Sequence, residues 1–157
     1  MAIKTKQVAN RRQVQFQTYQ DVLEDVRGMA AGKYRTLGNW SFGEICEHLA
    51  KTMDMSIDGS NAKFPWVLRM IGPYFKRRFI TRPMPAGFNI PQSAAAALVP
   101  DRSETAAGVA KLETAIGRMN QIAKREPHAM FGPMTRDEWD QLHMRHCELH
   151  LSFVVPE

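Results

Sequence analysis

The stretch Trp139-Asp-Gln-Leu-His-Met-Arg-His-Cys-Glu-Leu-His150 decides how this chain is expected to fold. His143, His146 and His150 fall within it among apolar residues, and residues three or four apart on a helix share one face. Imidazole is costly to bury because its ring nitrogens need partners. The spacing therefore predicts a helix whose histidine-bearing face points into the core. Metal ligation is the leading explanation for histidines at these buried positions.

A further histidine lies on the core face of an earlier predicted helix. Ser41-Phe-Gly-Glu44 fits a capping box, and the apolar residues that follow at helical spacing share a face with His48. In a helix bundle, one ligand from this helix and a spaced pair from the last helix can meet at one ion. His48 is therefore a candidate metal ligand.

The spacing leaves two candidate pairs on the last helix. His146 and His150 are one turn apart, and His143 and His146 are three residues apart. His143 and His150 are about 10.5 Å apart along the axis, too far for one ion. We favour His146 and His150 as ligands, with His143 supporting them or contacting the substrate.

The remaining periodicity predicts an all-α protein. Amphipathic patterns indicate a helix over Arg12–Ala31, a helix that follows a capping box at Asp101–Glu104 and runs to about Glu126, and a last helix from Arg136 to about Val154. The last helix also begins with a capping box, Thr135–Glu138. No segment alternates with period two, so no sheet is expected.

Two segments lie between the second and third long helices. Residues 64–80 predict two short helices separated at Gly72-Pro73, and the proline-rich residues 81–100 predict a long connection without a helix of its own. Together these features favour a four-helix bundle with short extra helices and a long crossover loop. We expect a flexible N-terminus over residues 1–11 and a single domain over residues 12–157.

Composition narrows the classes of function. The chain has 157 residues, 44% of them hydrophobic, and no apolar run of membrane-spanning length or signal-peptide pattern. We therefore expect a cytoplasmic protein without a membrane partner. The net charge of +5 is densest at Lys76-Arg77-Arg78 and comes with no nucleic-acid motif. A solvated face is favoured there over a site for nucleic acid, a membrane surface or an anionic substrate.

The two cysteines are not expected to bind the metal. Cys46 and Cys147 are neighbours of histidines in sequence, but their positions point in other directions around the helix. A disulfide between them is disfavoured in a cytosolic setting.

The predicted ligand set indicates an open metal site. Three neutral imidazoles leave a fourth position free, as in catalytic centres, and the ion lowers the pKa of water bound there. No general base, nucleophile elbow or phosphate loop is evident in the sequence. Met84, Phe88 and Ile90 are candidates for a pocket wall.

These segments resemble the DinB-like superfamily of metal-binding four-helix proteins. The resemblance is carried by Asn39–Leu49 and Trp139–His150, and Met84–Phe88 with His128–Trp139 resemble an uncharacterised bacterial branch. It spans the chain from about Arg12 to Pro156. The resemblance implies that His48, His146 and His150 hold a divalent metal ion, often zinc or nickel. Related families include transferases that use low-molecular-weight thiols, and other members carry the label of metal-dependent hydrolases. A metal-bound thiol needs no separate base, so of the two activities that the resemblance implies, thiol transfer is favoured over hydrolysis. Lys76–Arg78 could attract an anionic thiol cofactor.

Three hypotheses follow. The first is a metal-dependent enzyme, a thiol transferase or hydrolase that acts on a small molecule and forms a homodimer, as many relatives do. The second is a non-catalytic stress-response module that binds a metal or a small ligand. The third is a helical interaction protein whose histidines are merely packed. The sequence assigns no catalytic residue and no thiol-binding residue.

Overall fold

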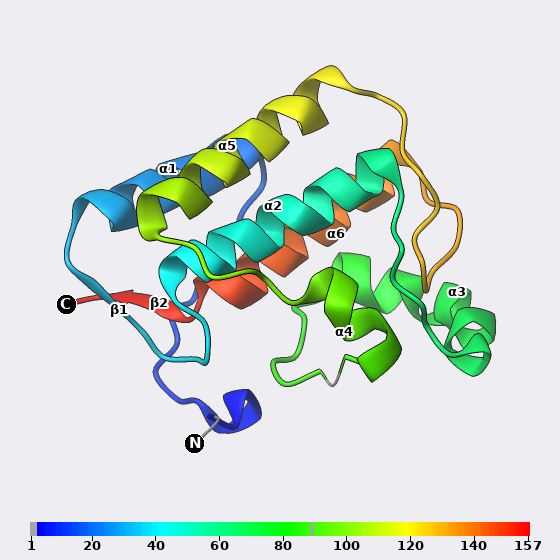
Figure 1. Ribbon diagram of the computed structural model, residues 1–157, viewed down its shortest axis with the longest axis horizontal. Coiled ribbons are helices and arrows are strands. Elements are labelled where there is room, and N and C mark those ends of the chain that lie inside the picture. The colour runs from blue at the N-terminus through cyan, green and yellow to red at the C-terminus, as the bar shows by residue number, and fades with distance from the viewer. Residues whose placement is uncertain (1–2, 89) are drawn as a thin grey trace.

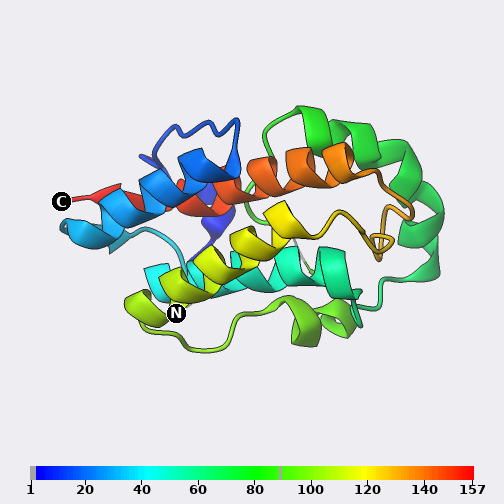
Figure 2. The same cartoon turned by 90° about the horizontal axis from the view of Figure 1, so that it is seen from above.

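The computed structural model describes residues 3–88 and 90–157 and is mostly helical (Figure 1). Helices α1, α2, α5 and α6 lie alongside one another, whereas α3 and α4 lie at the periphery (Figures 1 and 2). Among the described residues, no helix is both long and apolar enough to cross a membrane. The elements are η1 (Thr5–Gln7), α1 (Tyr19–Ala31), β1 (Tyr34–Thr36), α2 (Phe42–Asp58), α3 (Trp66–Thr81), α4 (Gln92–Leu98), α5 (Thr105–Gln121), α6 (Arg136–Leu151) and β2 (Val154–Pro156).

The hydrophobic core lies between α1, α2, α5 and α6. Each of these helices turns an apolar stripe inward, and burial of such stripes is the main favourable term in folding. Helix α2 contacts both α5 and α6, so it is central to the core. The largest fully buried side chains are Val22, Val26, Phe42, Leu49, Met53, Leu112, Ile116, Met119, Leu151 and Val154.

Two of the predicted capping boxes are confirmed. The side chains of Ser41 and Thr135 accept hydrogen bonds from the backbone N–H groups of Glu44 and Glu138, which fixes where α2 and α6 begin. The box predicted at Asp101–Glu104 is wrong, because Glu104 is itself the N-cap of α5 and makes no side-chain cap.

The ends of other helices differ from the prediction. Helix α1 begins at Tyr19, not Arg12, because a capping box formed by Thr18 and Asp21 starts it. Helix α5 ends at Gln121, before Glu126.

A short antiparallel pair of strands corrects the expectation of no sheet. Tyr34 of β1 pairs with Pro156 of β2, and α6 therefore ends at Leu151, not Val154. Strands this short cannot display a period-two pattern, so the sequence carries no signal for them. Arg12 ties the segment before α1 to this region, because its Nε atom donates to the carbonyl oxygen of Val154 in β2. Its other guanidinium nitrogens donate to both carboxylate oxygens of Asp25 in α1, at 2.6 and 2.8 Å.

The predictions for residues 64–100 are wrong in two places. Helix α3 is continuous through Pro73, which removes a hydrogen bond to the carbonyl of Arg69. Both residues are exposed, so water can satisfy that carbonyl. The supposed helix-free connection contains α4, because the run Ser93–Leu98 is rich in alanine, the strongest helix former.

Helices α2 and α5 cross at two glycines. A Cβ atom on Gly43 would lie 2.2 Å from the carbonyl oxygen of Ser103, and one on Gly108 would lie 2.2 Å from that of Gly43. Both contacts are with backbone, which cannot rotate away. The crossing therefore fixes the position of α2 relative to α5, and with it the position of the ligand candidate on α2.

Replacement of Gly108 by alanine should lower the free energy of unfolding by about 1–3 kcal/mol or more, because the added methyl group forces the helices apart. Gly117 lies in the same helix, and a methyl group added there would meet no atom within 4 Å, so Gly117→Ala should be neutral or stabilising by up to about 1 kcal/mol. Urea denaturation of both variants measures the difference. Equal stability of the two variants would contradict the close crossing.

Candidate metal centre

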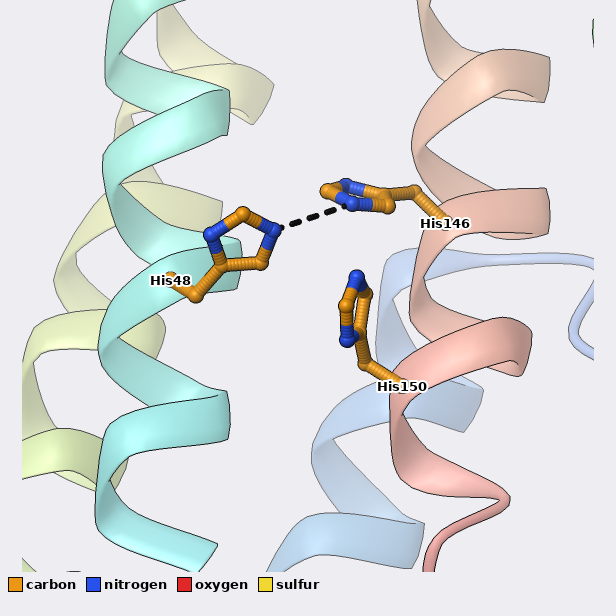
Figure 3. A group of neighbouring side chains, drawn as sticks. All are labelled: His48, His146 and His150. Carbon is orange, nitrogen blue, oxygen red and sulfur yellow. Dashed lines mark hydrogen bonds between the residues drawn. The ribbon is translucent and has the colours of Figure 1, made fainter. Parts of the chain in front are cut away.

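Three histidine rings from two helices converge on one point (Figure 3). His48 comes from α2, and His146 and His150 come from consecutive turns of α6. One ring nitrogen from each residue lies within 4.8 Å of the other two, and the Nε2 atoms of His48 and His146 are 3.1 Å apart. The structure thus brings together the three histidines that the sequence singled out, and His143 lies outside this group.

Hydrogen bonds on the far side of two rings determine which nitrogens face the shared point. His48 Nδ1 lies 2.7 Å from the carbonyl oxygen of Leu98, which can only accept, so Nδ1 carries the proton. His146 Nδ1 lies 3.4 Å from Thr52 Oγ1, and the Thr52 hydroxyl donates to the carbonyl of Leu49. Thr52 Oγ1 therefore accepts from His146. Both Nε2 atoms are left with lone pairs.

This arrangement fits a divalent ion. Two nitrogen lone pairs that face each other at 3.1 Å repel unless a cation or a proton lies between them. Tetrahedral zinc with Zn–N bonds of about 2.0–2.1 Å separates its nitrogen ligands by about 3.3 Å. The Leu98 carbonyl and Thr52 hydroxyl are the kind of outer partners that orient metal-binding imidazoles.

The electrostatics keep all three rings neutral. Burial lowers the pKa of His48 to about 4. Burial, and then repulsion from the neighbouring imidazoles, holds the pKa of His146 well below its usual range, and burial with repulsion from His48 does the same for His150. Neutral imidazole is the form that binds metal, so the site is ready for an ion at neutral pH.

The three rings form part of the wall of a cavity of about 410 Å³. Met84, Phe88 and Ile90 line it, which confirms the prediction that this segment shapes a pocket wall. Trp40 also lines it and stacks on His150, with ring centroids 5.4 Å apart. The candidate ligands therefore open into an apolar chamber large enough for a small molecule.

His143 lines the same cavity but has a different environment. Its side chain is only 2% exposed, and its ring stacks on Trp139 at 5.3 Å. Its Nε2 atom is buried with no hydrogen-bond partner among the described residues. A buried ring nitrogen without a partner is uncommon in folded proteins, which marks His143 as a residue whose role is not explained by packing alone. The predicted role of His143 stays a prediction.

His128 has a structural role in the loop before α6. Its Nδ1 atom accepts hydrogen bonds from the backbone N–H groups of Met130 and Phe131, both at 3.0 Å. Its ring stacks on Phe131, and burial lowers its pKa to about 4. His128 therefore holds the turn that leads into the helix of His146 and His150.

Other chemically active groups near these residues point elsewhere. Cys46 and Cys147 are free and buried in the core, where burial raises the pKa of Cys46 to about 12. Glu47 forms an ion pair with Lys111, and Glu148 forms one with Arg145. Among the described residues, the cluster able to hold a metal contains only histidines.

Three supporting residues were missed by the sequence analysis. Thr52 lies four residues after His48, so helical spacing alone could have placed it on the ligand face. Leu98 contacts His48 through its backbone carbonyl, and the ring of Trp40 stacks on His150. The identities of Leu98 and Trp40 do not indicate these contacts in the sequence.

Comparison with known families adds one finding. Residues 8–157 match a family described as "Protein of unknown function (DUF1569)". The chain belongs to this family. Searches of curated proteins and of solved structures give no match. The family description names no activity, and the histidine cluster and the cavity are the features of this DUF1569 protein that indicate a function.

The buried His128 makes stability depend on pH. Its pKa is lower in the folded chain than in the unfolded chain, so the unfolded state binds more protons below about pH 6.5 and stability falls as the pH decreases. His128→Asn keeps an acceptor for the loop amides but does not titrate. Between pH 7 and pH 5, with a chelator present, the variant should lose about 2 kcal/mol less unfolding free energy than the parent. Parallel pH profiles would contradict the neutral, buried state of His128.

Proposed function

We propose that His48, His146 and His150 hold a divalent metal ion, zinc or nickel, and that the site performs thiol-dependent transfer or hydrolysis on a small apolar molecule. The observation that carries the proposal is the pair of Nε2 lone pairs that face each other at 3.1 Å, with both Nδ1 atoms engaged by oxygen acceptors. A proton between the rings would satisfy the same pair, but the low pKa values of the three histidines disfavour a shared proton at neutral pH.

The proposal includes a DinB-like four-helix bundle as the scaffold. Helices α1, α2, α5 and α6 contact one another around one core, and the ligand candidates project inward from two of them. Bundles place metal sites in this way, from side chains on facing helices. The resemblance of Asn39–Leu49 and Trp139–His150 to that superfamily supports the same arrangement.

The chain's own residues would bind and orient the reactants. A divalent ion held by three neutral imidazoles lowers the pKa of a water or thiol that enters its open position. The apolar wall formed by Met84, Phe88 and Ile90 excludes bulk water and favours an apolar reactant. His143 can hold a polar atom of that reactant through its unpartnered ring nitrogen. The described residues supply no carboxylate to this cluster as a base, which favours the thiol over water as the nucleophile.

The basic group Lys76–Arg78 is not part of the cavity wall. Lys76 forms an ion pair with Glu138 at 2.7 Å, and Arg77 and Arg78 are exposed. An anionic thiol cofactor would therefore have to be recognised elsewhere, and these residues need another explanation.

The second candidate function is a non-catalytic module that binds a metal or a small ligand in a stress response. It is favoured by the same apolar cavity and by the absence of a general base among the described residues of the histidine cluster. A measurement of substrate turnover distinguishes this binding module from the proposed enzyme.

The purified protein should bind about one equivalent of zinc or nickel per chain, measured by elemental analysis and by titration against a competing chelator. His146→Ala removes a ligand and should abolish stoichiometric binding. His128→Asn changes a histidine outside the group and should keep the ion. Retention of a full equivalent by His146→Ala, or no binding by the parent protein, would overturn the site.

Thr52→Val should weaken metal affinity by about tenfold or more, because the proton on His146 Nδ1 loses its acceptor and the ring loses its orientation. Thr52→Ser keeps the hydroxyl and should restore most of the affinity. The same chelator competition measures both variants. Equal affinities for valine and serine variants would show that the hydroxyl does not orient the ring.

A panel of bacterial low-molecular-weight thiols with small apolar electrophiles tests for turnover. We expect metal-dependent loss of free thiol that falls at least about a hundredfold in His146→Ala. Metal-loaded protein that consumes no thiol and hydrolyses no ester or amide in the same panel would support the binding module instead.

A further inference from the structure

One side of α3 exposes a continuous apolar surface. Trp66, Met70 and Tyr74 are spaced by four residues and are 70, 63 and 86% exposed. A second exposed stripe, Val67, Ile71 and Phe75, lies beside the first, because each of its members is one residue further along the helix. At 100° per residue the six side chains cover about half of the helix circumference. We call these six residues the α3 face.

The opposite side of α3 fastens the helix to the rest of the molecule. A Cβ atom on Gly72 would lie 2.1 Å from the carbonyl oxygen of Met130, so the helix backbone packs directly on that loop. Lys76 forms an ion pair with Glu138 of α6, and Phe79 packs on Phe131 with ring centroids 5.3 Å apart. Gly72, Lys76 and Phe79 share the inner side, so the α3 face points outward.

Charge on α3 is of one sign. No acidic residue occurs between Trp66 and Thr81. Arg69, Arg77 and Arg78 are exposed, and Lys63 and Arg82, also exposed, flank the helix. Only Lys76 among its basic residues is used in an ion pair within the described chain. The helix thus combines an apolar face with an unneutralised positive rim.

The apolar side chains and the positive charge together indicate what binds to the α3 face. A second copy docked through the α3 face about a two-fold axis would bring two positive rims together, which is destabilising. An anionic lipid surface supplies both an apolar interior for the α3 face and negative charge for the arginines. Trp66 and Tyr74 are residue types that concentrate at the boundary between lipid and water, and arginine side chains can extend to the headgroups.

We infer that α3 docks this protein on an anionic lipid bilayer, with the α3 face lying in the interface and Arg77 and Arg78, at its C-terminal end, against the headgroups. The position of α3 at one edge of the molecule leaves the face free to lie flat on a surface (Figures 1 and 2). This departs from the expectation of a solvated basic face without a membrane partner, because the sequence did not show that the apolar half of the helix is outward. The inference is independent of the metal.

Flotation of the full-length protein with vesicles tests the docking. The protein should float with vesicles of phosphatidylcholine and phosphatidylserine, and much less with phosphatidylcholine alone. Higher salt should weaken binding, because it screens the arginines. The emission of Trp66, the most exposed of the three tryptophans, should shift to shorter wavelength when the anionic vesicles are added.

Matched variants separate charge from folding. Arg77→Gln with Arg78→Gln should lower partitioning by about an order of magnitude or more. Lys33→Gln with Arg102→Gln removes the same charge from exposed positions outside α3 and should have little effect. Trp66→Ser with Met70→Ser should also lower binding, and unchanged thermal melting of these variants shows that they fold. His146→Ala should bind vesicles like the parent, so failure of the metal site and failure of docking are distinguishable.

Three results would overturn the inference. One is no flotation with the anionic vesicles. Another is an equal loss of binding in the α3 and control charge variants. The third is a dimer in sedimentation experiments without lipid that Trp66→Ser with Met70→Ser dissociates, because the α3 face would then be occupied by a second copy.

Discussion

Desolvation of imidazole is the constraint on which the site depends. A buried ring nitrogen that loses water needs another partner, and this chain provides one for some nitrogens and not for others. Leu98 and Thr52 satisfy the outer nitrogens of His48 and His146, and two amides satisfy His128. The inner nitrogens of the cluster are left to face one another. The pattern of satisfied and unsatisfied atoms, more than the number of histidines, distinguishes a ligand set from a packed core.

The parts of the structure that follow local rules could be predicted from the sequence. The capping boxes at Ser41 and Thr135 and the helical spacing of the histidines predicted α2, α6 and the convergent group, because each depends on residues within one or two turns. The strand pair of β1 and β2 could not be predicted, because its stability comes from pairing between distant ends of the chain. The predicted helix break at Pro73 in α3 was wrong. The free-energy cost of Pro73 depends on whether water reaches the carbonyl of Arg69, and the fold, not the local sequence, determines that.

The contacts on the outer side of the imidazole rings could not be predicted from the sequence either. The carbonyl of Leu98 reaches His48 from α4, a helix that was not predicted because residues 81–100 are rich in proline. Thr52 could have been predicted to lie near His48, since it lies one helical turn later, but a threonine on a helix face does not by itself indicate a metal site. The two surfaces of α3 illustrate the same limit. Periodicity shows that a helix has an apolar side, whereas only the packing of Gly72 and Phe79 shows that the more apolar side is turned outward.

The crossing of α2 and α5 at Gly43 and Gly108 has a consequence for how a molecule could enter the chamber. Backbone lies against backbone there, so a roll of either helix would press a side chain into the other, and the wall that carries His48 has little room to move. A movement that admits a molecule is easier on the other side, where Met84 and Phe88 lie on a chain segment without regular hydrogen bonding. One rigid wall and one compliant wall would let the chamber open while the geometry of the imidazoles stays fixed.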